Sequence, residues 1–428
     1  MRIKRMLASL AIGTAATVVV AGCATGNTDT DAGAGQNGET IELTYAMWDT
    51  SQEPVFKKIF EAFTAENPNI TVKTQVIAFK NYWTKRQTEA SNGTLPDVFW
   101  MNPQNFPLYA SEGILAPVED GNGAVADDIP QTMRDLYTYD GTLYSFPNNR
   151  DAIAVWYNKK LFDAAGLDYP TEDWTTEDFT ETASALTGDG VWGASVTTDG
   201  RATYTATIRN EGGSILNDDR TAAALNSPEG EAGVEFWADL VASGSSPTLT
   251  QIAEDDPFSL FLSEKVAMVP SGSWMALPFA DSPLAAEGAI GVVSYPYGAA
   301  GTNITTTSSL GNMMPANAEH PEASLALIQF LGSKKAAEIY ASNGIGLTAY
   351  PELDGLFVEH FEASFDLTPY SDAVAIADPI PRTTNTSAWA GDVGTELGRA
   401  INGDVSVSEA LQSAERIIDD AIAAAGGK

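Results

Sequence analysis

Short apolar runs alternate with amphipathic stretches along most of the chain. Runs rich in β-branched and aromatic residues predict strands at 41–48, 70–77 and 97–101. Apolar residues that recur three and four positions apart predict helices over 53–66 and 81–92. The predicted buried face of the first helix consists of Val55, Ile59, Phe60 and Phe63. This β-α-β-α-β start is typical of an α/β fold with largely parallel strands.

The alternation continues to the C-terminus. Further strands are predicted at 152–157, 266–269 and 289–295. Helices are predicted from Lys159 to a glycine stop at Gly166, after a capping box of Thr175 and Asp178, after Ser227-Pro228, over 321–342 as one long helix, and over 407–425. At 428 residues the chain exceeds the size at which one core keeps growing, so two lobes are expected.

The N-terminus has the features of a lipoprotein export signal. Arg2, Lys4 and Arg5 precede an apolar stretch over 6–21 that is too short to span a membrane comfortably. The stretch ends in Val-Ala-Gly-Cys, which resembles the bacterial lipobox and predicts cleavage after residue 22 and lipidation of Cys23, the sole cysteine. A buried or free cysteine beside an uncleaved anchor is the alternative.

A polar, glycine-rich segment follows the cysteine. Residues 23–40 lack apolar periodicity and are expected to form a flexible tether between the lipid and the folded body. No later segment is apolar and long enough for a membrane span, so the lipid is the expected membrane contact. A lipidated Cys23 also leaves the mature chain without disulfides.

Composition excludes several classes of function. The formal charge is −34, and removal of the three basic residues of the leader makes it −37. Such a negative charge disfavours binding to nucleic acid. The two histidines have no neighbouring partners for a zinc site or a Ser/His/Asp triad. Gly-rich phosphate loops are missing, so no cofactor and no metal are expected. A hydrolase with two remote carboxylates stays open.

Aromatic and amide residues follow predicted strands or lie in turns, where α/β crevices bind ligands. They form five groups: Trp48-Asp49, Trp100–Asn105, Asn148–Asp151, Trp274 and Trp389. Sugars suit such residues, because their C–H faces pack on indole rings and their hydroxyls pair with planar polar side chains. Trp100 and Trp237 are expected in the core, since both lie in strand or helix patterns.

Several segments together resemble a known family. They are 45–48, 54–72, 95–100, 152–161, 265–274 and 320–331, in this order and spacing. The chain resembles the extracellular solute-binding proteins of bacterial ABC transporters, in the sugar-binding group that includes maltose-binding protein. The resemblance implies the α/β periplasmic-binding-protein-like fold: two lobes, each a mixed, mostly parallel sheet flanked by helices, with a cleft and a hinge between them. The implied lobes are 41–152 with 306–345, and 153–305 with 346–428.

The resemblance also implies the ligand contacts, residue by residue. Asp151 matches an acidic hinge position that binds sugar in the family, and two tryptophans match stacking positions of the second lobe. The full set of expected ligand contacts is Trp48, Asp49, Asn102, Asn105, Asn149, Arg150, Asp151, Arg201, Tyr204, Trp274, Gly311, Asn312, Arg382 and Trp389. The maltose site is not reproduced position for position, so maltose is not inferred.

The implied function is capture of a carbohydrate, with an oligosaccharide favoured because several tryptophans suggest several subsites. The expected partners are this sugar, the permease subunits and ATPase of an ABC importer, and the membrane through the lipid anchor. A monomer on the outer face of the cytoplasmic membrane is expected, without enzymatic activity. The alternatives are a surface-anchored, carboxylate-dependent glycoside hydrolase and, third, an adhesin or peptide binder.

Overall fold

The computed structural model describes residues 40–118 and 129–426. The predicted signal, Cys23 and all but the last residue of the predicted tether lie outside these ranges. Within them, no helix is long and apolar enough to cross a membrane.

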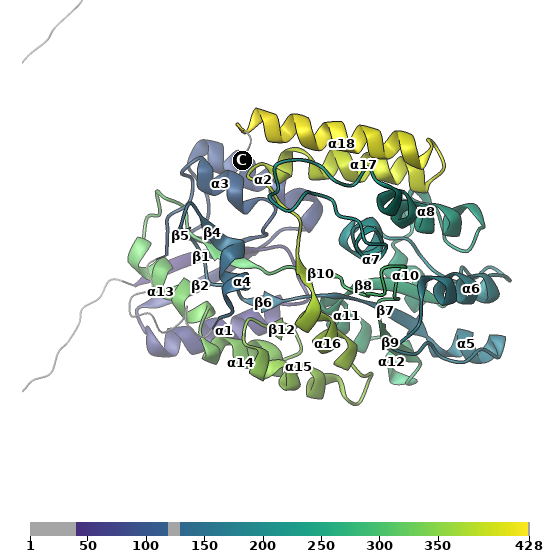
Figure 1. Cartoon of the computed structure of the whole chain (residues 1–428). Helices are drawn as coiled ribbons and strands as arrows, with labels where there is room; N and C mark the ends of the chain where they lie inside the picture. Colours follow the sequence, from purple (N-terminus) through teal and green to yellow (C-terminus); the bar gives the residue numbers. More distant parts are fainter. Residues whose placement is uncertain (1–39, 119–128, 427–428) are drawn as a thin grey trace, which may run out of the picture. The chain divides into compact units, whose positions relative to one another are not determined.

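The first sheet is built on β1 (Ile41–Met47), which runs parallel to both of its neighbours, β2 (Ile70–Val76) and β3 (Val98–Met101). A fourth strand, β11 (Gly311–Met313), returns from late in the chain and pairs antiparallel with β3. The strand order is β11-β3-β1-β2. The predicted β-α-β-α-β start is therefore confirmed (Figure 1).

The first two helices cover the predicted ranges closely. α1 (Glu53–Glu66) has the predicted bounds and buries the predicted apolar face together with Phe56. α2 (Phe79–Asn92) begins two residues earlier than predicted and ends at Gly93, whose φ of 67° is the left-handed cap that glycine favours. Periodicity thus located both helices.

The second sheet differs from the predicted mostly parallel sheet. Its central strand is β7 (Ile153–Asn158), which pairs antiparallel with both β8 (Met268–Gly272) and β9 (Ile290–Ser294). All six residues of β7 are buried. A strand buried on both faces reads as a continuous apolar run whatever the direction of its neighbours, so the sequence pattern did not reveal the direction.

The predicted long helix over 321–342 is also wrong. The structure has two helices, α13 (Pro321–Leu331) and α14 (Lys334–Ser342). Between them, a Cβ added to Gly332 would lie 2.5 Å from the Phe146 side chain, and the Ser333 hydroxyl caps α14 by accepting a bond from the Ala336 amide. Close packing and a local cap interrupt a pattern whose apolar spacing continues across the break.

The remaining predicted helices are present. They are α5 (Lys159–Ala165), α6 (Thr176–Leu186), α8 (Pro228–Ala242) and α18 (Val407–Ala424). The capping box of Thr175 and Asp178 is complete, and its hydrogen bonds lower the pKa of the Asp178 carboxyl.

The other helices and strands of the described chain are short, and the sequence pattern did not predict them. They are α3 (Phe106–Ser111), α4 (Gln131–Arg134), η1 (Asp135–Tyr137), β4 (Thr138–Tyr139), β5 (Thr142–Leu143), β6 (Asn149–Arg150), η2 (Arg201–Thr205), α7 (Ala206–Asn210), α9 (Leu249–Glu254), α10 (Pro257–Leu262), η3 (Ser273–Met275), α11 (Ala276–Ala280), α12 (Pro283–Ala286), β10 (Thr306–Thr307), β12 (Leu347–Thr348), η4 (Pro351–Leu353), α15 (Asp354–Phe361), α16 (Thr368–Ile376), β13 (Asp378–Pro379), η5 (Thr386–Ala388) and α17 (Ala390–Ile401).

Buried apolar residues form three clusters. One surrounds the first sheet and continues past residue 345, the predicted lobe boundary, as far as Leu353. The other two lie on opposite faces of β7, since Ile153, Val155 and Tyr157 belong to one cluster and Ala154 and Trp156 to the other. The chain therefore passes from one sheet to the other along 147–153 and returns along 305–311.

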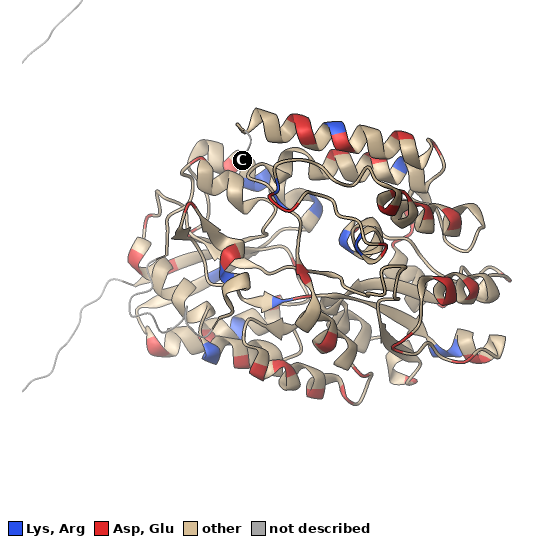
Figure 2. Cartoon of the chain, viewed as in Figure 1, with Lys and Arg blue, Asp and Glu red and all other residues tan. Residues whose placement is uncertain are grey.

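Acidic residues are dispersed over the outer helices. Figure 2 shows Asp and Glu on many elements, including α6, α8 and α18, with few Lys and Arg among them. Among the described residues no group of three or more His, Cys, Asp or Glu could hold a metal ion. This distribution agrees with a solvating role for the negative charge.

A polar network is buried beside the first sheet. Asn312 of β11 is fully buried; its Oδ1 accepts a bond of 2.6 Å from the Tyr45 hydroxyl, and its Nδ2 donates one of 2.6 Å to Asn148 Oδ1. Trp100 Nε1 donates to the same tyrosine oxygen at 2.6 Å. Each of these groups would lack a partner if the network were broken, so the network fixes how β11 joins the sheet.

Replacing Asn312 with alanine is expected to lower the free energy of unfolding by about 2 kcal/mol, because the Tyr45 hydroxyl and the Asn148 amide would lose partners in the core. Urea unfolding measures the loss. The control is Asn92→Ala at the exposed end of α2, for which little change is expected. Equal stability of the two variants would contradict the structural role of Asn312.

Candidate functional site

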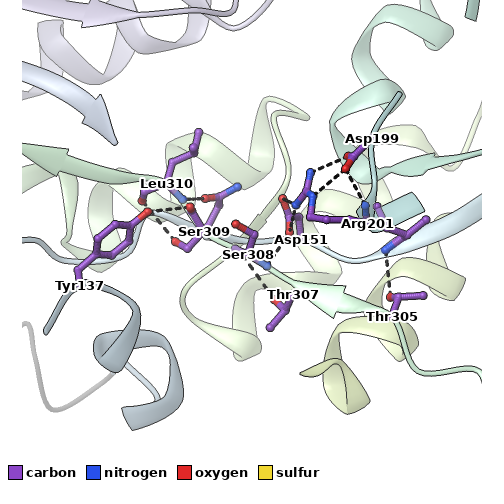
Figure 3. Close-up of polar contacts among 11 residues, drawn as sticks. Tyr137, Asp151, Asp199, Arg201, Thr305, Thr307, Ser308, Ser309 and Leu310 are labelled. Carbon is purple, nitrogen blue, oxygen red and sulfur yellow. Dashed lines mark hydrogen bonds and ion pairs between the residues drawn. The ribbon is translucent and has the colours of Figure 1, made fainter. Parts of the chain in front are cut away.

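The two segments that connect the sheets are bonded to each other at Asp151. The Asp151 amide donates to the Ser308 carbonyl at 3.2 Å, and the Ser308 amide donates back to the Asp151 carboxylate at 2.8 Å (Figure 3). Two residues earlier, Asn149 Oδ1 accepts a bond of 2.7 Å from the Leu310 amide. Side chains of the outgoing segment therefore hold the backbone of the returning one.

A buried tyrosine adds a third hydrogen-bonded connection where the two segments cross between the sheets. The Tyr137 hydroxyl lies 2.8 Å from the carbonyl oxygen of Ser309 (Figure 3) and 2.8 Å from that of Met101. Burial raises the pKa of this hydroxyl well above its ordinary value, so it stays protonated as a donor. This connection links the end of β3 to the returning segment.

Arg201, the first residue of η2, extends the network from the crossing to the loop that contains Asp199. Its guanidinium lies 3.3 Å from the Asp151 carboxylate and 3.0 Å from that of Asp199 (Figure 3). Burial acts to lower the pKa of Arg201, but the two carboxylates outweigh it and raise the pKa above its ordinary value. The guanidinium also lies over the ring of Trp274, 4.8 Å from the ring centroid.

A cavity of about 900 Å³ opens beside Arg201. Its wall comes from five regions: the loop before α3, the segment around η2, Ile215 after α7, helix α9, and the segment over 380–402 that contains α17. The lining residues include Gln104, Thr197, Asp199, Arg201, Tyr204, Leu249, Ala253, Trp389, Gly391, Gly394, Gly398 and Asn402. The cavity thus combines carboxylate, guanidinium, amide and hydroxyl groups with aromatic and aliphatic surface.

Three of the predicted contacts line this cavity. Arg201, Tyr204 and Trp389 are brought together from η2 and from the start of α17. Burial raises the pKa of the Tyr204 hydroxyl above its ordinary value, which keeps it a neutral donor. Trp389 is only 4% exposed, and its indole nitrogen donates to Thr383 Oγ1 at 2.8 Å, so its orientation is fixed by the protein.

Two neighbours cover part of the ring of Trp274, which is half-buried. Arg201 covers it at 4.8 Å, and a Cβ added to Gly272 would lie 1.8 Å from a ring carbon. The structure therefore places Trp274 as a support for Arg201 at the edge of the ion network.

The predicted contacts at the ends of β1 and β3 are arranged differently. Trp48 packs edge-on against Tyr82 and Trp100, with ring centroids at 5.0 and 4.8 Å. Asp49 accepts bonds from Ser51 and Gln52 at the start of α1, and Asn102 Oδ1 accepts bonds from the Asn105 amide and side chain. These side chains organise the loops that follow β1 and β3.

Other predicted contacts serve structural bonds. Arg150 donates to the Thr348 carbonyl and pairs with Asp354, whose pKa is raised because burial outweighs the attraction of the arginine. Gly311 packs against the ring of Tyr137, where a Cβ would lie 2.9 Å from the ring. Arg382 donates to the carbonyls of Asp135 and Leu136. Asn312 belongs to the network beside the first sheet.

The cavity also contains residues that sequence reasoning missed. Asp199 precedes Arg201 by two residues and could have been paired with it from that spacing. Gln104 lies inside the loop over 100–105, which had been singled out through Asn102 and Asn105. Nothing in the sequence pattern marks the glycines of α17 as part of a wall.

Comparison with known proteins places the chain in a family. Residues 49–338 match the model described as bacterial extracellular solute-binding protein, which is more than half of the chain. The chain belongs to this family. This membership confirms the family predicted from the sequence, and it assigns the chain an extracellular binding role, not an enzymatic one.

Individual relatives match most of this chain. A putative binding protein of Brucella abortus is 27% identical over 307 residues, which are 69% of this chain and 72% of the relative. The multiple sugar-binding protein of Streptococcus mutans is 24% identical over 324 residues, or 71% of this chain and 73% of that protein.

A solved structure agrees over nearly the whole chain. An ABC substrate-binding protein of Listeria monocytogenes, in complex with cycloalternan, superposes with a TM-score of 0.81 at 26% identity and covers 90% of this chain and 100% of its own. The predicted α/β periplasmic-binding-protein fold is thereby confirmed, apart from the antiparallel second sheet and the division of the predicted helix over 321–342.

Replacing Asp151 with alanine is expected to lower the free energy of unfolding by about 2 kcal/mol, because the half-buried Arg201 charge would lose one of its two partners and the Ser308 amide would lose its acceptor. Urea unfolding checks this value.

The matched control is Asp378→Ala, which breaks an exposed pair with Arg209 in which both side chains are 44% exposed. A loss below about 0.5 kcal/mol is expected there, since solvent screens exposed pairs. A loss at Asp378 as large as that at Asp151 would contradict the importance of the crossing network.

Proposed function

We propose that this protein binds a carbohydrate, and specifically an oligosaccharide, and delivers it to an ABC importer. The observation that carries the proposal is the cavity of about 900 Å³ in which Trp389 and Tyr204 lie beside the paired Arg201 and Asp199. Aromatic surface suits the C–H face of a sugar ring, and charged planar groups suit pairs of hydroxyls. Pockets of about 300 to 1,000 Å³ enclose small ligands.

The comparisons support the same class of ligand. The Streptococcus mutans relative is named for binding multiple sugars, and the Listeria monocytogenes protein was solved with cycloalternan as an ABC substrate-binding protein. Delivery to permease subunits with an associated ATPase follows from this likeness. We expect the protein to act as a monomer.

Hinge closure is the proposed means of capture. Lobe 1 would comprise 41–152 with 306–345, and lobe 2 would comprise 153–305 with 346–428. The segments that cross between them are bonded at Asp151 and Ser308, and Arg201 joins this point to the cavity wall. A sugar that contacts Arg201 would therefore act on the site where the lobes meet.

Replacing Gly391 with leucine tests whether the cavity is the binding site. Gly391 lies at the second position of α17 on the cavity wall, and a Cβ there meets nothing within 4 Å, so the larger side chain would enter open space. We expect at least about a tenfold loss of sugar affinity, measured by calorimetry with a glycan selected on an array.

Gly355→Leu is the matched control. Gly355 is also exposed, also second in its helix, α15, and also has nothing within 4 Å of an added Cβ, but it lies outside the cavity lining. The sugar affinity of the Gly355→Leu variant should equal that of the unaltered chain. Equal affinities for both leucine variants would remove this cavity as the sugar site.

Anchoring through Cys23 is the proposed way in which the protein stays at the outer face of the cytoplasmic membrane. The lipobox-like sequence before this sole cysteine supports it, and residues 24–40 would form the tether.

In cells, Cys23→Ala should move the protein from the membrane fraction to the soluble fraction or the medium, as followed by immunoblotting of fractionated cells. Affinity for the sugar should be unchanged, because the cysteine lies far in sequence from every cavity residue. A variant that remains fully in the membrane fraction would contradict the lipid anchor.

A further inference from the structure

A second cavity, of about 400 Å³, adjoins the first, because three residues line both of them. Two arginines that take no part in the network at Asp151 line this second cavity, Arg209 and Arg220. We call it the arginine cavity. Its wall is drawn from α7, the loop after α7, β10 and the segment around β13, and the lining residues fall within 205–209, 212–220, 304–306 and 378–381.

Arg220 occupies a strained position in a loop whose shape is fixed by Asn217. Asn217 Oδ1 accepts bonds from the Thr221 amide at 2.8 Å and the Ala222 amide at 3.1 Å. The Arg220 amide donates to the Asn217 carbonyl at 2.9 Å. In this loop Arg220 has a φ of 58°, in the left-handed region that favours glycine. An arginine there carries strain that glycine would avoid, and such strain is typical of functional positions.

The guanidinium of Arg220 is available to a ligand. The side chain is exposed, and within 40–118 and 129–426 it has neither an ion pair nor a hydrogen bond. Arg382, which follows the lining residue Pro381, likewise has no ion pair in the described chain, because it donates to the carbonyls of Asp135 and Leu136. Burial lowers the pKa of Arg382 to about 10, and repulsion from Arg220 acts in the same direction. The two like charges therefore interact across this end of the cavity.

Arg209 is only partly engaged by its neighbour. Its Nε donates to Asp378 Oδ2 at 2.6 Å, with both side chains 44% exposed. Its two Nη atoms have no partner in the part of the chain that the structure describes, so an edge of the guanidinium remains available. With Arg382 included, three arginines face two carboxylates here, those of Asp218 and Asp378. This local excess of positive charge occurs in a chain of net charge −34.

The β10 side of the arginine cavity adds a hydroxyl without a partner. Thr306 is 4% exposed, and its Oγ1 is buried and makes no hydrogen bond among the described residues. The hydroxyl of the preceding Thr305 is used, since it accepts a bond of 3.2 Å from the Ile153 amide. A buried hydroxyl without a partner lowers stability, and its hydrogen can rotate towards an acceptor that enters the cavity.

From these observations we propose that the arginine cavity binds a small oxyanion, that is, a phosphate, sulfate or carboxylate group. Its oxygens accept bonds from the Arg220 guanidinium, from the Nη edge of Arg209 and from the Thr306 hydroxyl. Arginine suits such groups because its planar fork of N–H donors matches two oxygens at once. The bound anion also reduces the repulsion between Arg220 and Arg382, and it connects the loop after α7 to β10, beside the returning segment.

Two sources can supply this oxyanion. It is either a free ion from solution or an acidic substituent of a sugar, which can reach the arginine cavity because the two cavities adjoin. The site is independent of the proposed function, since none of its three donors belongs to the first cavity. Binding of neutral glycans tests the proposed function, and binding of anions tests this site.

Calorimetric titration of the full chain with sulfate, phosphate and glucuronate tests the arginine cavity, with chloride at equal ionic strength as the reference. The unaltered chain should bind at least one of the three saturably. Arg220→Gln removes the charge at similar length and should weaken that binding at least about tenfold. Asp378→Asn should strengthen it about threefold, because it removes a negative charge from the wall and releases Arg209.

Arg416→Gln is the matched control. Arg416 is also exposed and also has no ion pair in the described chain, but it lies on α18, outside both cavities. Its anion affinity should stay within about twofold of that of the unaltered chain. Arg220→Gly separates loss of binding from loss of folding. This variant should lose the anion yet melt at a higher temperature than the unaltered chain in chloride buffer, because glycine relieves the strain.

The outcomes decide both the site and its source of anion. Binding of sulfate or phosphate supports the site with a free ion, and binding of glucuronate alone supports it with an acidic sugar. If no probe binds saturably, or if Arg220→Gln and Arg416→Gln weaken binding equally, the oxyanion site is wrong. Neither result changes the binding of neutral glycans in the first cavity, so the proposed function stands or fails separately.

Discussion

The carboxylate of Asp151 bonds to two parts of the chain that are far apart in sequence. It accepts a hydrogen bond from the Ser308 amide of the returning segment and pairs with the guanidinium of Arg201 in η2. Both interactions take place where the side chains are largely shielded from water, so losing either partner would leave a charge or an amide poorly solvated. This one carboxylate therefore links the path of the chain between the two sheets to the position of Arg201 at the cavity.

This arrangement also explains why Arg201 can serve as a rigid wall of the cavity. Its guanidinium is held by Asp199 on one side, by Asp151 on another, and by the ring of Trp274 beneath it. A long, flexible side chain that is fixed in advance loses little entropy when a ligand binds. Three glycines of α17, Gly391, Gly394 and Gly398, also line the cavity, so part of its wall carries no side chain.

Local patterns predicted the parts of the fold that local physics determines. The bounds of α1 and the capping box at Thr175 followed from apolar spacing and from the hydrogen-bonding reach of a threonine. The break at Gly332 did not, because its cause is the contact with Phe146, nearly two hundred positions earlier. The antiparallel second sheet was missed for a related reason, since a strand buried on both faces carries no sign of its neighbours' direction.

The same distinction between local and tertiary causes applies to the residues of the candidate site. Arg201, Tyr204 and Trp389 were placed in the site by the resemblance to a family and do line the cavity. Asn312 has the polar side chain expected of a ligand contact, but its side chain is hydrogen-bonded to Tyr45 and Asn148. Whether a polar residue faces a ligand or a neighbouring strand depends on tertiary contacts, and so does the membership of Thr197 in the cavity wall.

Hydrogen–deuterium exchange of the full chain, with and without a glycan that it retains, tests the central claim most directly. A sugar that binds in the cavity and acts on the crossing segments should slow exchange over 389–402, over 197–205, and over both 147–153 and 305–311. Slowed exchange confined to other elements, with these four segments unchanged, would contradict the account.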